Sequence, residues 1–250
     1  MPHPYLDYDA PIGFAHRGGA NVFPENTERA FRHATELGFR YLETDVHATA
    51  DGVLVAFHDD RLDRVTDRSG KIIDLPWSQI AEARVDGTDP IMRFEELLEA
   101  FPDARINIDP KADTAIEPLA AAIRATRVQD RVCVTAFSRR RTKRVKALVG
   151  DDLCTGGAAG ATLQTMLRGA PLGLRREVDV LQVPVSVGPV TVVSERFVDT
   201  AHAAGIHVHV WTIDEPAEMR RLLDLGVDAI MTDEPEILRD VYAERGHSVS

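Results

Sequence analysis

Residues 105–134 read RINIDPKADTAIEPLAAAIRATRVQDRVCV, and this stretch contains two strand patterns separated by one helix pattern. Ile106 and Ile108 alternate with polar residues, and residues 132–134 form a short apolar run, so both ends are typical of buried strands. Ala115–Arg127, between them, carries apolar residues at helical spacing. A strand, a helix and a second strand in this order form the repeating unit of a parallel sheet covered by helices.

The same alternation continues in both directions along the chain. Strand patterns begin near residues 12, 41, 105, 131, 153, 179, 206 and 228. Nearly every interval holds one helix pattern: a first one from 24–27 to 37–38, and then Ala115–Arg127, Ser138–Val149, Ala161–Arg168, Ser194–Ala204, Pro216–Leu225 and Glu236–Glu244. Eight such units predict an α/β fold, the (β/α)8 or TIM barrel, which typically takes about 250 residues, the length of this chain.

The interval between the strand patterns at 41 and 105 is more than twice as long as any other. It starts with a hairpin signal, Asp51-Gly52, between strand-like residues, and continues as a charged, turn-rich segment with a weak helix pattern at Trp77–Arg84. We expect residues of about 60–92 to form a short cap insertion after the second strand, bordering the active-site end of the barrel. With no Pro-, Gly- or Ser-rich linker, residues 1–250 are expected to form a single domain.

The composition excludes several classes of function. Lys and Arg number 29 against 40 Asp and Glu, and the net charge of -11 argues against nucleic-acid binding and against stable association with anionic membranes. We find no signal-peptide pattern and no apolar run of about 20 residues, so a soluble, cytoplasmic protein is expected. Cys133 and Cys154 lie in different strand patterns without metal-motif spacing, which predicts buried free thiols. The sequence indicates no oligomeric state.

Polar side chains follow the first two strand patterns. The first ends abruptly in His16-Arg17-Gly18-Gly19, which exposes a charged pair beside backbone that an anion can approach closely. Glu43 and Asp45 are two residues apart in the second strand, so their side chains share one face. If Asp51-Gly52 is a two-residue loop, His58 lies opposite Asp45 in the hairpin.

The third strand pattern adds Asp109 and Lys111, which also share one face. In a barrel the carboxyl ends of the strands meet at one rim, so we expect Asp109 to lie near the carboxylates of the second strand and near His16. Three carboxylates without cysteine favour Mg²⁺, Ca²⁺ or Mn²⁺ over structural zinc. Lys111 then becomes a candidate phosphate contact together with Arg17.

Four further features have both a structural and a functional interpretation. Trp211 follows the strand pattern at 206, where it either packs or stacks on an apolar or cationic part of a substrate. His207 and His209 lie below that strand end and are expected to pack in the interior. Asp214 and Asp233 each precede a helix pattern with proline and are interpreted as N-caps, as is Asn26 or Thr27 at the first helix.

Taken together, the motifs resemble those of the glycerophosphodiester phosphodiesterases. The matching segments stand in family order and cover almost the whole chain: His16-Arg17-Gly18-Gly19, Pro24-Glu25-Asn26-Thr27, Glu43-Thr44-Asp45-Val46, Asp51-Gly52, His58-Asp59, Asp109-Pro110-Lys111, Trp211-Thr212 and Thr232-Asp233-Glu234-Pro235. Asp109 stands where many members have Glu.

The resemblance implies a metal-dependent hydrolase that cleaves glycerophosphodiesters to glycerol 3-phosphate and an alcohol, with a small-molecule substrate and one divalent cation. His16 and His58 are the implied acid and base, in either order, and water or the substrate's own 2-hydroxyl is the nucleophile. The implied metal ligands are Glu43, Asp45 and Asp109. The implied substrate contacts are Arg17, Lys111 and Trp211.

Two alternatives use the same scaffold. A phospholipase D acting on lysolipids or sphingolipids needs an apolar landing surface at the barrel mouth, and residues 60–90 show no such stretch. A non-catalytic sugar-phosphate binding protein needs the cation but not two proton carriers. A metal amidohydrolase barrel fits less well, because the first strand ends in His-Arg-Gly and not in His-x-His.

Overall fold

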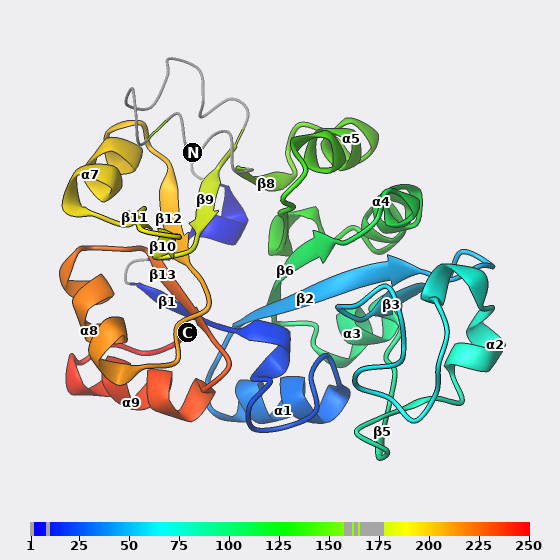
Figure 1. The fold of residues 1–250 in the computed structure, drawn as a ribbon. Helices are drawn as coiled ribbons and strands as arrows, with labels where there is room; N and C mark the ends of the chain where they lie inside the picture. Colours follow the sequence, from blue (N-terminus) through cyan, green and yellow to red (C-terminus); the bar gives the residue numbers. More distant parts are fainter. Residues whose placement is uncertain (1–2, 9–10, 158–161, 163–164, 166–177) are drawn as a thin grey trace.

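The computed structural model describes residues 3–8, 11–157, 162, 165 and 178–250. Within these residues lies a closed barrel of eight parallel strands (Figure 1). Each strand pairs with its neighbours, and β1 pairs with both β13 and β2, which closes the barrel. The predicted TIM barrel is confirmed, with every strand beginning within one residue of its predicted start. The barrel strands are β1 Ile12–Ala15, β2 Tyr41–Ala48, β6 Arg105–Pro110, β7 Val132–Val134, β8 Cys154–Gly157, β9 Val180–Val183, β12 His207–Val210 and β13 Ala229–Thr232.

Helices lie outside the strands (Figure 1) and bury one apolar face against them. The helices are α1 Glu28–Glu36, α3 Phe94–Ala100, α4 Ile116–Thr126, α5 Arg139–Val149, α7 Glu195–Ala203, α8 Pro216–Asp224 and α9 Pro235–Glu244. They match the predicted helices closely, with two exceptions. Ala161–Arg168 falls largely outside the described residues. Helix α3 was not predicted: it is short, and its start is marked by Glu96, which accepts a hydrogen bond from the Arg93 backbone at 3.0 Å.

The hairpin after β2 is present, but its predicted register is wrong by one residue. Strand β3 (Leu54–Ala56) runs antiparallel to β2, and Phe57, not His58, donates its backbone N–H to Asp45 at 2.9 Å. The loop has three residues instead of two. It ends in Gly52, whose φ of 82° gives the left-handed conformation that such loops require at their last position. His58 therefore reaches the barrel mouth from beyond the end of β3.

The segment after the hairpin forms small elements at the carboxyl end of β2, at the right of Figure 1. These are the 3-10 helix η3 Ile72–Asp74, helix α2 Trp77–Ile80 and the two-residue strands β4 Arg84–Val85 and β5 Asp89–Pro90. The segment has an apolar cluster separate from the main core, consisting of Val55, Phe57, Leu62, Ile72, Ile80, Ala83, Val85 and Ile91. Because this cluster anchors the segment, it holds residues 58–64 at the barrel mouth.

The N-terminal segment packs into the barrel interior, which the sequence did not reveal. Tyr5, in the 3-10 helix η1 (Pro4–Leu6), is fully buried, and its backbone carbonyl accepts a hydrogen bond from Tyr41 at 2.8 Å. Cys133 and Cys154 belong to the same cluster and are buried free thiols, as predicted. Within the described part of the chain, the side chains of this cluster therefore fill this end of the barrel interior.

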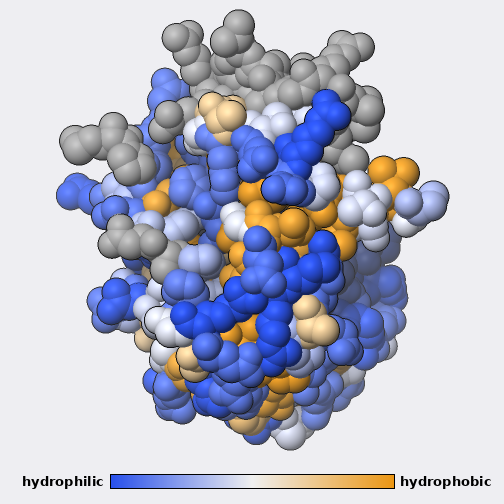
Figure 2. All heavy atoms as spheres, turned by 90° about the vertical axis from the view of Figure 1, so that its left-hand side faces the viewer, coloured by the Kyte–Doolittle hydropathy of each residue, from blue (hydrophilic) through white to orange (hydrophobic). Residues whose placement is uncertain are grey.

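The surface shows few large apolar residues. Figure 2 views the side that carries α7, α8 and α9, where hydrophilic residues dominate and apolar residues are exposed near the centre. A short hairpin after β9, formed by β10 (Ser186–Val187) and β11 (Val190–Thr191), exposes two valines, and Phe137 after β7 is 70% exposed. None of the described helices is both long enough and apolar enough to cross a bilayer.

The interior holds one imidazole with a consequence for stability. His209 on β12 is fully buried against the ring of Phe14, 5.2 Å between centroids, with Tyr8 Oη 3.3 Å from Nε2 and Gln182 Nε2 3.4 Å from Nδ1. Burial lowers the pKa of His209 to about 3. An unfolded histidine titrates near 6.5, so between about pH 3 and 6.5 the unfolded chain binds the extra proton. His209 therefore costs stability as the pH falls through this window.

We expect His209→Gln to remove this dependence. Relative to the variant, the wild type loses about 1.4 kcal/mol of unfolding free energy per pH unit as the pH falls from 6 to 4. Urea unfolding at pH 4, 5 and 6 measures the difference. His247→Gln, which replaces an exposed histidine near the C-terminus, is the control. Parallel curves for His209→Gln and the wild type would contradict the assignment.

Candidate active site

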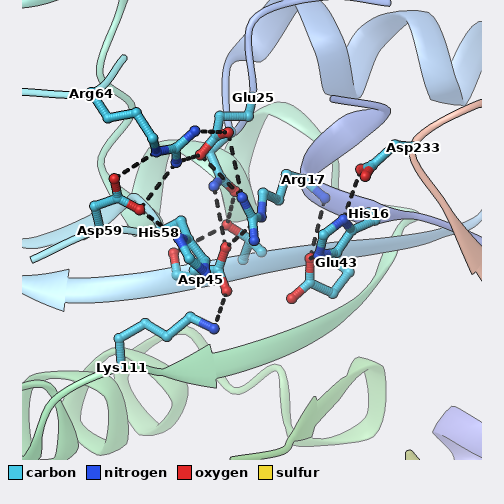
Figure 3. Close-up of polar contacts among 12 residues, drawn as sticks. His16, Arg17, Glu25, Glu43, Asp45, His58, Asp59, Arg64, Lys111 and Asp233 are labelled. Carbon is cyan, nitrogen blue, oxygen red and sulfur yellow. Dashed lines mark hydrogen bonds and ion pairs between the residues drawn. The ribbon is translucent and has the colours of Figure 1, made fainter. Parts of the chain in front are cut away.

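The polar residues His16 and Arg17 lie in a tight turn directly after the first strand. His16–Gly18 form the 3-10 helix η2 directly after β1. Arg17 adopts a left-handed conformation with φ 51°, and Gly18 follows with φ 86°. A Cβ on Gly18 would lie only 2.7 Å from that of Ala30, so the turn packs against α1 only because this residue is glycine. The turn aims His16 and Arg17 toward the carboxyl end of β2 (Figure 3).

Glu43 and Asp45 project from one face of β2, as predicted, and both are buried. Glu43 Oε2 accepts the backbone N–H of Arg17 at 3.1 Å and lies 3.8 Å from His16 Nε2. Burial and the neighbouring charge of Asp45 raise the pKa of Glu43 to about 7. A buried carboxylate pair of this kind favours the binding of positive charge.

Two basic side chains already contact Asp45. Lys111 Nζ lies 2.8 Å from Oδ1, and Arg17 Nε lies 3.1 Å from Oδ2 in an ion pair without hydrogen-bond alignment. Burial acts to raise the pKa of Asp45, but the charges of Lys111 and Arg17 outweigh it and lower that pKa below its ordinary value. Asn26 Nδ2 adds a long contact of 3.5 Å. Asp45 is therefore the electrostatic centre of the site.

Asp109 on β6 stands in register with Asp45 on β2. Lys111 Nζ lies 2.6 Å from Asp109 Oδ2 and so bridges the two carboxylates. The structure thus brings together the predicted residues of three strands. Among the described residues, however, no group of three His, Cys, Asp or Glu side chains is arranged around a common point suitable for a metal ion, because the lysine lies between two of the three carboxylates.

The donor set itself fits a hard divalent cation. Glu43, Asp45 and Asp109 offer only carboxylate oxygens, the ligands that Mg²⁺, Ca²⁺ and Mn²⁺ prefer. Burial and the charge of the neighbouring Asp45 raise the pKa of Glu43, although His16, Lys111 and Arg17 act to lower it. Burial likewise raises the pKa of Asp109, despite the ion pair with Lys111. Added positive charge would stabilise the ionised form of both carboxylates.

Each of the two candidate proton carriers has a carboxylate on Nδ1. Asp233 Oδ1 lies 2.7 Å from His16 Nδ1, and Asp59 Oδ1 lies 2.6 Å from His58 Nδ1 (Figure 3). A carboxylate accepts a hydrogen bond from Nδ1–H and leaves Nε2 free for proton exchange with a ligand. Burial acts to lower the pKa of His16, but Glu43 and Asp233 outweigh it and raise that pKa.

The N-cap interpretation of Asp233 and Asp214 is wrong. Helix α9 begins at Pro235 after Glu234, and the Asp233 side chain contacts His16. Asp214 Oδ1 accepts the backbone N–H of Asp233 at 2.8 Å and so holds the end of β13. Both aspartates precede proline and resemble caps locally, but the barrel brings them to the rim. The position of Asp233 at a strand end was the available signal for its role.

Asn26 and Thr27, directly before α1, have different roles in the structure. Thr27 caps α1, since its Oγ1 accepts the Ala30 backbone N–H at 3.3 Å. Asn26 is instead buried in a left-handed conformation, and its Oδ1 accepts a hydrogen bond from Thr44 at 2.8 Å. Sequence reasoning missed Asn26 as a site residue. It also missed Glu25 and Arg64, which form ion pairs next to His58 and Arg17.

An open cavity of about 480 Å³ adjoins these residues on the insertion side. Its wall consists of His47, Lys111 and residues 58–61, 63 and 64. Trp211 does not line this cavity. It follows β12, three strands away from β2 around the barrel, where its ring contacts Phe137 edge-on with 5.7 Å between centroids. The rim therefore has a polar side at the insertion and an aromatic side at Phe137 and Trp211.

Comparison with known proteins gives the family. The model of the glycerophosphoryl diester phosphodiesterase family matches residues 16–237. A Mycobacterium tuberculosis protein named "Probable glycerophosphodiester phosphodiesterase 2" is 41% identical over 97% of this chain and 94% of its own length. The human protein named "Lysophospholipase D GDPD1" is 27% identical over 90% of this chain and 84% of its own length.

Solved structures share the fold. A Silicibacter pomeroyi protein superposes with a TM-score of 0.84 at 22% identity, covering 99% of this chain and 98% of that one. An Oleispira antarctica phosphodiesterase, solved with its product sn-glycerol-3-phosphate, has a TM-score of 0.79 at 23% identity and covers 93% and 96%. With the family match over residues 16–237 and the 41% identical relative, the fold completes the assignment. The chain belongs to the glycerophosphoryl diester phosphodiesterase family, and it is a phosphodiester hydrolase.

Proposed function

We propose that this hydrolase cleaves glycerophosphodiesters to glycerol 3-phosphate and an alcohol, with His16 and His58 as the proton carriers. The observation that supports this proposal best is the pair of imidazoles at the rim, each with a carboxylate on Nδ1, beside the buried pair of Glu43 and Asp45. A relative with the same fold was solved with sn-glycerol-3-phosphate. A site that only bound a sugar phosphate would not need two oriented imidazoles.

The reaction needs two proton transfers. One imidazole accepts the proton of the attacking hydroxyl, from water or from the substrate's glycerol, as the new O–P bond forms. Where the substrate's own 2-hydroxyl attacks, this step forms a cyclic glycerol phosphate, and water then opens it to glycerol 3-phosphate in a second step with the roles of the two imidazoles exchanged. The other, as imidazolium, donates its proton to the leaving alkoxide as the old P–O bond breaks. Each transfer typically contributes roughly 10²–10⁴-fold to the rate. Asp233 and Asp59 hold the two rings in the tautomer that exposes Nε2.

The phosphate carries negative charge that the site must balance. Glu43, Asp45 and Asp109 would hold a divalent cation, Mg²⁺, Ca²⁺ or Mn²⁺, which when bound would supply positive charge to stabilise the phosphate. Arg17 and Lys111 supply further positive charge, since both end beside Asp45. Lys111 also lines the cavity, so its ammonium group is within reach of a phosphate bound there.

A substrate panel tests the proposal. Purified protein is incubated with glycerophosphocholine, glycerophosphoethanolamine, glycerophosphoglycerol and lysophosphatidylcholine, and the release of glycerol phosphate and of the free alcohol is measured. Turnover of the three glycerophosphodiesters supports the proposed function. If the protein bound the panel compounds but cleaved none of them, the result would favour a non-catalytic sugar-phosphate binding protein.

Phospholipase D activity on lysolipids is the second candidate. Phe137, 70% exposed, lies beside Trp211 at the rim, and such an exposed aromatic pair can contact an acyl chain. The lysophosphatidylcholine member of the panel distinguishes this candidate. If it is the better substrate, and Phe137→Ala lowers only its turnover, the lysolipid activity is the principal one.

Lys111→Met is expected to weaken all diester substrates of the panel by a similar factor. The loss of one charge-assisted phosphate contact is worth about 1.5–3 kcal/mol, or about 10- to 100-fold in kcat/KM. Trp211→Ala is the comparison variant, and it is expected to change the ranking among alcohols instead. Measured kcat/KM values across the panel give both patterns. A lysine effect confined to one alcohol, with a uniform tryptophan effect, would reverse the orientation of the substrate.

The cellular setting follows from the same features. We infer a cytoplasmic enzyme of lipid and glycerol metabolism, composed of a single domain over residues 1–250 with an insertion at about 60–92. The two free thiols, Cys133 and Cys154, suit a reducing compartment. The net charge of -11 disfavours nucleic acids and anionic membranes as partners.

A further inference from the structure

One guanidinium group connects the insertion to both sides of the site. Arg64 donates from Nε and Nη2 to Asp59 at 2.6 and 3.1 Å, and from Nη1 and Nη2 to Glu25 at 3.0 and 2.7 Å (Figure 3). Asp59 follows the hairpin, whereas Glu25 belongs to the loop before α1. The planar fork of arginine matches two carboxylates in this way, and a lysine cannot reproduce it.

Each of these carboxylates contacts a residue of the proposed machinery. Asp59 Oδ1 lies 2.6 Å from His58 Nδ1, and Glu25 Oε1 lies 3.3 Å from Arg17 Nη1. Hydrogen bonds from Arg64 lower the pKa of Asp59 to about 2. Asp59 therefore stays ionised at any working pH and acts only as an acceptor for the imidazole.

The two imidazoles differ in how their carboxylates are fixed. Asp233, which holds His16, has its own backbone N–H bound to Asp214 at the end of β13. His58 instead lines the open cavity, with 34% of its side chain exposed, and the side chain of Asp59 is oriented by Arg64. Without Arg64 the Asp59 carboxylate and the His58 ring could rotate into the cavity.

We propose that Arg64 is the positioning residue of this active site: it orients Asp59, and through it His58, and it orients Glu25, and through it Arg17. The inference rests on the proposed function, because it assigns His58 to proton transfer and Arg17 to the phosphate. Arg64 itself contacts neither imidazole nor Asp45. Its effect is therefore on the geometry of the reacting groups, where a displacement of about 1 Å can cost about 10²-fold in rate.

Measurements of stability and of catalysis together distinguish a positioning role of Arg64 from a purely structural one. Arg64 is 48% exposed, and ion pairs at such exposed positions contribute little to folding stability. We therefore expect Arg64→Ala to lower kcat by about 10- to 100-fold while the urea midpoint stays near that of the wild type. Arg64→Lys keeps the charge but loses the fork, and is expected to recover little of the loss. Arg68→Ala is the matched control, since Arg68 lies in the same insertion, is 53% exposed, pairs with Glu82 at 3.4 Å and does not line the cavity.

The decisive experiment combines kinetics with a tautomer measurement. Arg64→Ala is made alone and together with Asp59→Asn, and the His58 ring nitrogens are observed by NMR, assigned with His58→Gln. We expect Arg64→Ala to lower kcat much less in the Asp59→Asn background than in the wild type. Both changes break the same chain of contacts from Arg64 through Asp59 to His58, so their effects are not additive. We also expect the Nδ1–H tautomer in the wild type and a mixture in Arg64→Ala.

The outcomes are distinguishable from those of the proposed function. A wild type without turnover on the panel would contradict the function, whereas the tautomer measurement tests the role of Arg64 without turnover. An Arg64→Ala variant as active as Arg68→Ala, additive losses with Asp59→Asn, or full recovery by Arg64→Lys would overturn the inference.

Discussion

His16→Ala and His58→Ala are each expected to lower kcat by at least about 10²-fold, because each removes one of two proton transfers that the diester cleavage requires. KM is expected to change much less, since neither ring is assigned to ground-state binding of the phosphate. The carboxylates on Nδ1, at 2.7 Å for His16 and 2.6 Å for His58, are placed to orient these rings. Steady-state kinetics on the preferred glycerophosphodiester measure both parameters.

Two controls accompany the histidine variants. His33→Ala removes an imidazole that pairs with Glu236 away from the site, and its kinetics should equal those of the wild type. Metal affinity, measured by calorimetry, should persist in His16→Ala and His58→Ala because neither is proposed as a ligand. If either variant lost the metal yet turned over substrate when the ion was added in excess, that histidine would be a ligand and not a proton carrier.

Chelation is expected to abolish turnover, and Mg²⁺, Mn²⁺ or Ca²⁺ to restore it, since the three proposed ligands are all carboxylates. Full activity in excess chelator would remove the metal from the mechanism. A second readout is the stabilisation of the folded protein by the bound ion, which amounts to about 2.7 kcal/mol at an ion concentration of 100 Kd. Thermal unfolding with and without each ion measures it.

Glu43→Gln tests the metal site further, because it is expected to act in opposite directions on the metal-free and the metal-bound protein. The pKa of Glu43 is raised to about 7 in the folded protein, above its unfolded value of about 4.5, so ionised Glu43 costs stability above pH 7. At pH 8 and without metal, the variant is therefore expected to be at least as stable as the wild type. It is also expected to lose most of the metal-induced stabilisation and most of the activity.

Glu117→Gln is the control for Glu43→Gln, since Glu117 lies on the surface of α4 in an ion pair with Arg144. It should change neither metal-induced stabilisation nor turnover. An unchanged metal shift in Glu43→Gln would exclude Glu43 as a ligand. A destabilised apo form would show instead that Glu43 is needed by His16 and Arg17 for folding.

The sequence by itself determined the barrel and most of its rim. Strand and helix patterns are local, because side-chain period depends only on the backbone conformation of neighbouring residues. The convergence of Glu43, Asp45 and Asp109 followed from the same periods, once the strands were taken as parallel. The helix α3 was missed because seven residues are too few for the period to stand out.

Local sequence patterns did not predict features that depend on loop conformation or on packing between distant segments. The hairpin register depended on the left-handed conformation of Gly52, which adds one residue to the loop. The phosphate contact of Lys111 stays a prediction, but its ion pairs with Asp45 and Asp109, which belong to two different strands, were not predicted. No local pattern contains that information.

The contacts of the candidate proton carriers His16 and His58 with their carboxylates came only from the tertiary structure. Asp233 and His16 are 217 residues apart in the chain, and Arg64 and Glu25 are 39 apart. Locally, Asp233 resembles a helix cap and Arg64 an exposed charge of a turn-rich segment. Barrel closure places the end of β13 beside the end of β1, and the apolar cluster of the insertion holds residues 58–64 beside the loop before α1. Hydrogen bonds and ion pairs of a few ångströms form only after such packing has placed their partners, so their geometry belongs to the folded chain and not to any segment of it.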